Sequence, residues 1–114
     1  MTYPTSDNPY PTPDNPKRAP IWENYVIAQS VAASCGQIPE HTLAFGVEVN
    51  GVNLRLRFQL SKVTEEDEAD MSDIAGELEA LVGNDVNVDY YCEVRDHRQI
   101  TPTDGVCWIF LARV

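Results

Sequence analysis

The dipeptide Asn50-Gly51, with the two runs that flank it, constrains the fold of this chain more than any other feature. Residues 43–49 and 52–60 both alternate apolar and polar side chains, which is the period of a half-buried strand. Asn-Gly between two such runs predicts a tight hairpin, because both turn positions of the common turn need positive φ. A two-residue turn pairs Val49 with Val52, and continued pairing puts the apolar side chains on one face. The opposite face then carries Glu48, Arg55, Arg57 and Gln59.

A first helix is expected before this hairpin, over residues 20–35. Pro20 suits the first turn of a helix, and Gly36 suits the position just after its end. The spacing of the apolar residues indicates one buried stripe. We expect that stripe to contain Trp22, Val26 or Ile27, Ala28, Val31 and Ala32.

A second helix is expected between Thr64 and Gly83. Thr64 offers a capping hydroxyl, and the acidic residues 65–68 that follow it suit the positive end of the helix dipole. The side chains expected to face the core are Met71, Ile74, Leu78, Leu81 and Val82. The outward face should carry Asp70, Asp73, Glu77 and Glu79.

Two more strands complete the expected fold. Residues 86–95 alternate again, with Val86, Val88, Tyr90, Cys92 and Val94 on the apolar side. Residues 106–113 are apolar at almost every position, so we expect a strand that is covered on both faces, either as a central strand or with its outer face against a helix or a partner. The sequence therefore predicts an α+β domain in the order α-β-β-α-β-β. Its sheet should be four-stranded and antiparallel, built from two hairpins and closed on one face by two helices.

The first nineteen residues differ in composition from the rest of the chain. They contain five prolines and two copies of Asp-Asn-Pro, which predicts a flexible or polyproline-like tail at residues 1–19. A chain of 114 residues has room for one hydrophobic core, so we expect a single domain over residues 20–114. The chain lacks a secretory signal at its start and an apolar run of about twenty residues. We therefore expect a soluble cytoplasmic protein.

Charge is the feature that bears most directly on function. The chain has 18 acidic and 8 basic residues, a formal charge of −10, and residues 61–114 account for −9 of it. Such a field disfavours nucleic acids and anionic membranes as partners and favours a basic protein. The excess falls on the second helix and on the outward side of the third strand. The partner-binding residues predicted from this distribution are Glu65, Glu66, Asp70, Asp73, Glu77, Asp89, Tyr91 and Glu93.

Residues suited to catalysis are sparse. His41 lies in a polar connection, and His97 lies in a loop beside Asp96, where neighbouring side chains usually diverge. The three cysteines, Cys35, Cys92 and Cys107, show neither CxxC spacing nor a set of metal ligands. We expect free thiols, with a bridge between Cys92 and Cys107 left open as an alternative. The sequence thus predicts no catalytic site, no cofactor and no metal.

In size, acidity and α/β pattern, residues 20–114 resemble the immunity proteins of bacterial contact-dependent and polymorphic toxin systems. That resemblance implies a protein that neutralises a basic toxin, such as a nuclease, by electrostatic steering and occlusion of its active site. It carries no diagnostic motif, so it assigns no site residues.

Two other classes stay open, and the protein could be a monomer or a homodimer. A secretion-chaperone or YbjN-like adaptor would bind apolar peptide as a homodimer, near Trp108 and Leu111. A small-molecule enzyme would use Tyr90, Cys92 and His97.

Overall fold

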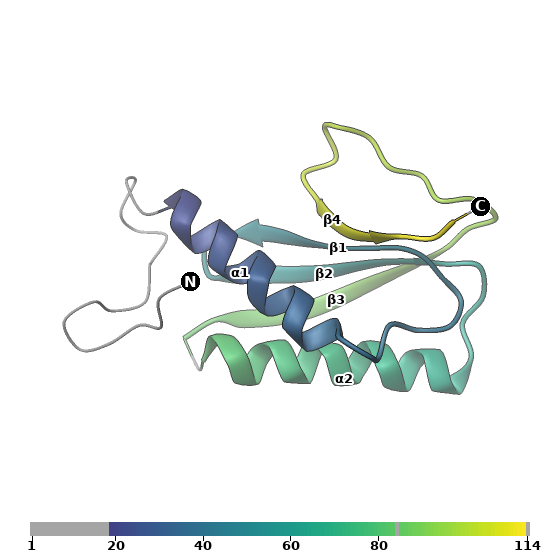
Figure 1. Ribbon diagram of the computed structural model, residues 1–114, viewed down its shortest axis with the longest axis horizontal. Coiled ribbons are helices and arrows are strands. Elements are labelled where there is room, and N and C mark those ends of the chain that lie inside the picture. The colour runs from purple at the N-terminus through teal and green to yellow at the C-terminus, as the bar shows by residue number, and fades with distance from the viewer. Residues whose placement is uncertain (1–18, 84, 114) are drawn as a thin grey trace.

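The computed structural model describes residues 19–83 and 85–113, which form two helices and one four-stranded sheet (Figure 1). The elements are α1 (Ala19–Ser34), β1 (Thr42–Asn50), β2 (Asn53–Leu60), α2 (Glu65–Val82), β3 (Asn87–Val94) and β4 (Cys107–Leu111). Their order confirms the predicted succession of helices and strands. The predicted tail lies outside the described residues, apart from Ala19, which begins α1.

The sheet is mixed, so the prediction of an antiparallel sheet made from two hairpins is wrong. The strand order is β3-β2-β1-β4. β1 pairs antiparallel with both β2 and β4, whereas β3 runs parallel to β2. A parallel connection needs a long crossover, and the helix α2 between β2 and β3 provides it. β3 and β4 consequently lie at opposite edges of the sheet.

The prediction of a central last strand is also wrong, because within the described chain β4 pairs with β1 alone. Cys107 and Leu111 on this edge strand are exposed. A register shift in the pairing with β1 lets both Ile109 and Phe110 pack against the core. Trp108 donates its indole N–H to the preceding loop. The apolar residues of this edge strand thus pack in two places: Ile109 and Phe110 against the core, and Trp108 against the preceding loop.

The β1–β2 hairpin forms as predicted, but with its pairing shifted by two residues. Asn50 pairs with Asn53, so Gly51 and Val52 occupy the turn. Gly51 has a φ of 61°, and Val52 does not have positive φ, which is the pattern of a type II′ turn. The indole N–H of Trp22 donates to the carbonyl of Gly51 at 2.9 Å. Because the shift is an even number of residues, the predicted apolar and polar faces are unchanged.

Both helices pack on the apolar face of the sheet and close one core. α1 crosses the strands diagonally, and α2 runs beside β3 (Figure 1). Met71, Ile74 and Leu78 of α2 are buried as predicted, whereas Leu81 is 36% exposed. The strands contribute Phe45, Val47, Leu54, Leu56, Phe58 and Leu60 to this core.

The buried stripe of α1 differs from the predicted one. Trp22 and Val26 are buried, but the stripe continues through Ser30 and Ala33, and Val31 is 48% exposed. Tyr25 is buried too, whereas Ala28 and Ala32 are exposed. The hydroxyl of Ser30 donates to the Val26 carbonyl at 2.8 Å, which removes the cost of burying it. Because its hydroxyl is hydrogen-bonded within the helix, Ser30 can lie among the apolar residues of the stripe.

The connection between β3 and β4 crosses the sheet on the face opposite the helices. Gln59 of β2 holds it, because its side chain both donates to the carbonyl and accepts from the N–H of Gln99, each at 2.7 Å. Gly46 of β1 lies under the end of this connection. A Cβ there would lie 2.5 Å from the carbonyl oxygen of Cys107 and 2.7 Å from Cγ1 of Val106. The crossing loop therefore needs glycine at this position.

Gly46→Ala is expected to lower the free energy of unfolding by at least about 2 kcal/mol, because the backbone of β4 must move to admit the methyl group. Gly76 on α2 is the matched control, since a Cβ there meets no atom within 4 Å. Gly76→Ala should raise the free energy of unfolding by about 0.5–1 kcal/mol through helix propensity. Urea unfolding measures both, and a neutral Gly46→Ala would contradict the close approach of the loop.

Candidate functional site

Among the helices and strands that the structure describes, α2 carries the most charge. Its 18 residues include eight acidic and no basic side chains, so the helix carries −8 of the formal charge of −10. Glu66, Asp70, Asp73 and Glu77 follow one another at spacings of four, three and four, which puts them on one stripe. Within the described chain, these four and Glu65, Glu68 and Glu79 form no ion pair. Five of the predicted site residues thus share one helix as unpaired carboxylates: Glu65, Glu66, Asp70, Asp73 and Glu77.

Asp67, the eighth carboxylate of the helix, is 1% exposed and serves the fold. Its backbone N–H donates to the Thr64 hydroxyl at 3.1 Å, and its carboxylate accepts from the Thr64 N–H at 3.0 Å. This is a capping box with aspartate in place of the usual glutamate. Nδ1 of His41 lies 2.7 Å from the same carboxylate. Thr64-x-x-Asp67 was the sequence signal for this role.

The pKa of Asp67 reflects two opposed effects. Burial alone would raise it, but the hydrogen bonds from Thr64 and His41 favour the ionised form and lower the pKa below its ordinary value. The carboxylate therefore stays charged inside the protein. It fixes the first turn of α2, and with it the position of the exposed carboxylates.

The predicted site residues on β3 are paired with arginines. Asp89 accepts from Arg55 through both oxygens, at 3.0 and 3.2 Å. Glu93 accepts from Arg57 at 2.9 Å and also binds Arg95. Burial would raise the pKa of Glu93, and the two guanidinium groups outweigh it and lower the pKa. These carboxylates already have cationic partners within the protein.

The charges of the ion-pair network on the outward face of the sheet consequently balance. Three carboxylates, Glu48, Asp89 and Glu93, face three guanidinium groups, Arg55, Arg57 and Arg95. Arg57 also lies over the ring of Tyr91, with Cζ 5.4 Å from the ring centroid, and Tyr91 is 51% exposed. The parallel register of β2 and β3 creates these pairs, because it sets Arg55 beside Asp89 and Arg57 beside Tyr91. The roles of the arginines depend on this register and could not be predicted from the sequence.

The structure does not bring the two predicted acidic surfaces together. α2 lies on the apolar face of the sheet, whereas Asp89, Tyr91 and Glu93 point to the opposite face. One surface is an array of unpaired carboxylates and the other is a network of ion pairs. A single partner surface made of both sets would have to wrap around the edge strand β3.

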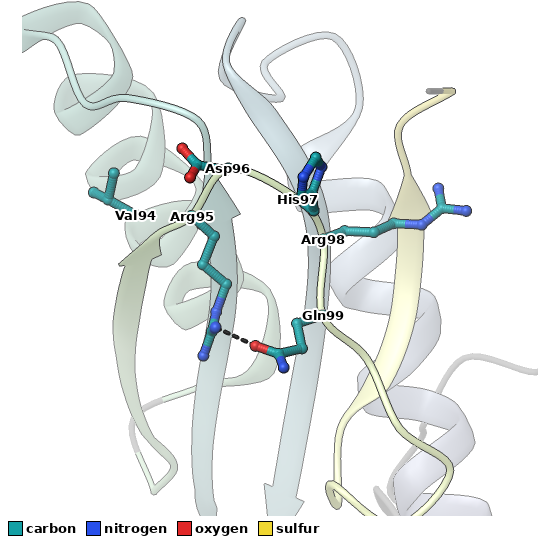
Figure 2. A pocket seen from close by; sticks show the side chains of 6 residues that line it. All are labelled: Val94, Arg95, Asp96, His97, Arg98 and Gln99. Atoms are coloured by element: carbon teal, nitrogen blue, oxygen red, sulfur yellow. Dashed lines mark hydrogen bonds between the residues drawn. The ribbon is translucent and has the colours of Figure 1, made fainter.

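A hollow of about 480 Å³ lies where the crossing loop begins (Figure 2). It is lined by Val94, Arg95, Asp96, His97, Arg98 and Gln99. Arg95 binds Gln99, and Arg98 reaches the carbonyl of Ala112. Figure 2 shows the side chains of Asp96 and His97 pointing away from each other, with no hydrogen bond between them among the residues drawn. The polar groups diverge, so they do not form a couple of acid and base.

Tyr90, Cys92 and His97, the residues predicted for an enzyme site, do not lie together either. Tyr90 and Cys92 belong to the side of β3 that faces the helices, where Tyr90 packs edge-on against Phe58. Neither lines the hollow around His97. Burial raises the pKa of the Cys92 thiol, and nearby carboxylates raise it further. A thiol held protonated in this way is a weak nucleophile.

The alternative of a bridge between Cys92 and Cys107 is wrong. Cys92 lies on β3 and Cys107 on β4, at opposite edges of the sheet. Three strand spacings separate the two edges, which is about 14 Å and far beyond the reach of a disulfide. All three cysteines are free thiols, as predicted, and Cys35 and Cys107 are exposed.

Comparison of the chain with protein-family models and with curated proteins finds no match. Across residues 19–83 and 85–113, no group of three or more His, Cys, Asp and Glu side chains is arranged to hold a metal ion. No helix in that part of the chain has both the length and the apolar character to cross a bilayer.

Asp67→Asn is expected to lower the free energy of unfolding at pH 7 by about 1–3 kcal/mol, because it weakens both the cap and the contact with His41. The folded pKa of Asp67 is lowered, so its contribution is complete above the ordinary carboxyl pKa of about 4 and is lost as the pH falls through the folded pKa. The variant should therefore also lose stability less steeply below pH 4. Urea unfolding at pH 7, 5 and 3 measures both effects.

Asp73→Asn, on the exposed side of the same helix, is the control for this pair of measurements. It should change the free energy of unfolding by no more than about 0.5 kcal/mol at pH 7. Equal effects of the two substitutions would contradict the role of Asp67 in fixing the helix.

Proposed function

We propose that the protein is a binding module for a basic protein and that it docks through the exposed side of α2. The observation that carries this proposal is the contrast between two surfaces. The carboxylates of the sheet are matched by arginines, whereas seven carboxylates of α2 have no ion-pair partner in the described chain. The negative charge that remains for a partner is thus concentrated on one helix.

Repulsion between neighbouring carboxylates destabilises α2 in the free protein, and this supports a role in binding. Like charges three or four residues apart on a helix destabilise it by about 0.2–0.5 kcal/mol per pair. Glu66 with Asp70, Asp70 with Asp73, and Asp73 with Glu77 are three such pairs. A cationic partner surface relieves this repulsion on contact. The same field accelerates association with a basic protein.

The helix is also held rigidly, so little order needs to be gained on binding. Met71, Ile74 and Leu78 anchor it in the core, and the capping box fixes its first turn. At 1.5 Å per residue its 18 residues extend for about 27 Å, which is enough to span an active-site cleft. A fixed row of carboxylates loses less conformational entropy on binding than a flexible acidic tail does.

Within this class, an immunity protein directed at a basic toxin fits best. The positively charged groups with which a nuclease holds phosphate offer the complement that a row of carboxylates needs. In this proposal α2 meets those groups, occupies the place of the substrate and blocks the active site. The acidity and the α+β pattern of the chain support the same role.

The docking face is tested with two variants of equal net charge. The first neutralises the α2 stripe through Glu66→Gln, Asp70→Asn, Asp73→Asn and Glu77→Gln. The control neutralises four exposed carboxylates elsewhere, through Glu23→Gln, Glu40→Gln, Asp85→Asn and Asp96→Asn. We expect the α2 variant to associate at least about tenfold more slowly with a partner recovered from extracts of the source cells, and the control to lose no more than about threefold.

Association rates by surface plasmon resonance at 50 and 500 mM salt provide the readout. The rate for the unchanged protein should fall at least about tenfold between the two salt concentrations. A recovered partner with no excess of basic residues, or a rate that does not depend on salt, would contradict the proposal. For the immunity role, expression of the partner alone should arrest growth, and co-expression with this protein should restore it.

A further inference from the structure

β3 is an edge strand with an open backbone. Within the described chain it pairs with β2 alone, and this pairing is regular over all eight residues. The N–H of Asn87 donates to Val52 at 2.8 Å, and the N–H of Arg95 donates to Leu60 at 2.9 Å. Odd-numbered residues therefore direct their backbone groups toward β2. The backbone groups that point outward are those of Val88, Tyr90, Cys92 and Val94.

This edge lacks three of the devices that protect other proteins against strand addition. Proteins block long edge strands with bulges, prolines or lysines, and β3 contains none of these. Tyr90, Tyr91 and Val94 on β3 are 38%, 51% and 63% exposed. The other edge strand, β4, has five residues and a register shift. β3 is thus the longer and the more regularly paired of the two edge strands.

Negative charge lies beside this edge on its helix side. α2 runs beside β3 (Figure 1), and Glu68 is close enough to Cys92, in the second half of that strand, for its charge to raise the pKa of the thiol, after burial and the charges of Asp67 and Glu93. Glu79 lies eleven residues after Glu68, which is three helical turns along the same flank of α2. Both side chains are exposed. An added strand would run beneath this flank.

The charges disfavour a second copy of the chain as the added strand. Antiparallel pairing about the centre of β3 would put Asp89 of one copy beside Glu93 of the other. It would also bring together two α2 helices that each carry −8. Like charges opposite one another destabilise strand pairs. A strand with basic side chains would instead be attracted to Asp89, Glu93 and the carboxylates of α2.

We propose that the open edge of β3 binds an extended, basic segment of the partner as a fifth strand. The proposal rests on the proposed function and specifies the partner's chemistry. Alternate side chains of the segment, those that face α2, are lysine or arginine. The intervening side chains lie on the neutral side, near Tyr91, and are uncharged. Main-chain hydrogen bonds to Val88, Tyr90, Cys92 and Val94 supply affinity, as in other strand-addition complexes.

The probes are two peptides of ten residues with the same composition and charge. One alternates lysine and threonine, and the other has five lysines followed by five threonines. At 50 mM salt we expect the alternating peptide to bind at least about fivefold more tightly, because it alone presents its charges on one side of a strand. We also expect it to slow hydrogen exchange at the amides of Tyr90, Cys92 and Val94 by at least about tenfold.

Equal affinity for the two peptides, or slowed exchange confined to α2, would overturn the strand addition. Either result would leave recognition of positive charge by α2 standing, so the proposed function would survive. Failure of both peptides to bind at 50 mM salt would contradict the proposed function as well. A homodimer at 100 µM that buries β3 would also overturn the inference.

A pair of variants at Val94 isolates the backbone contribution. Val94→Pro removes an outward N–H at an exposed edge position, where proline is tolerated, and leaves the β2–β3 hydrogen bonds intact. Val94→Ala removes the same side chain and keeps the N–H. We expect Val94→Pro to weaken binding of the alternating peptide at least about tenfold and Val94→Ala no more than about threefold. Equal binding by the two variants would overturn the proposal, and the exchange measurement tests it without any substitution.

Discussion

The parallel pairing of β3 with β2 determines most of what is distinctive about this protein. It requires a crossover, and that crossover is the acidic helix α2. It also sends β3 and β4 to opposite edges, so that residues 95–106 must cross the outward face of the sheet. Gln59 and Gly46 are adapted to this crossing, one by binding the loop and the other by leaving space for it.

The same pairing divides the charge of the chain into two unlike surfaces. In parallel register, the arginines of β2 meet the carboxylates of β3, and their charges cancel on the outward face of the sheet. α2 has no basic residue of its own, and its exposed carboxylates meet none from elsewhere in the described chain. The unpaired negative charge is thereby concentrated on one side of the molecule, along α2. This segregation is the physical basis of the proposed role in binding a basic protein.

Local structure could be predicted from the sequence wherever neighbouring residues determine it. The two faces of the β1–β2 hairpin follow from alternation, and α2 begins after Thr64 and ends before Gly83 because of their capping preferences. Strand order could not be predicted in this way, because periodicity shows which face a residue occupies and not which strand lies beside it. The ion pairs of Asp89 and Glu93 depend on that order, so composition alone could not show that these carboxylates are neutralised.

Single buried polar residues account for two other differences between prediction and structure. Ser30 lies in the buried stripe of α1, where its hydroxyl bonds within its own helix, and Val31 lies at the surface. Asp67 lies in the core because Thr64 and His41 supply its hydrogen bonds. In both cases a polar side chain is buried where its partners satisfy it, and the contact between His41 and Asp67 joins residues far apart in the sequence.

The central claim is that α2 presents the free carboxylates through which the protein binds. Covalent labelling of carboxyl groups by a carbodiimide and an amine, followed by mass spectrometry with and without the partner, tests it most directly. The account predicts that Glu66, Asp73 and Glu77 label rapidly in the free protein, that Asp67 labels slowly, and that the partner suppresses labelling along α2. Unchanged labelling of α2 in the complex, with suppression elsewhere, would contradict it.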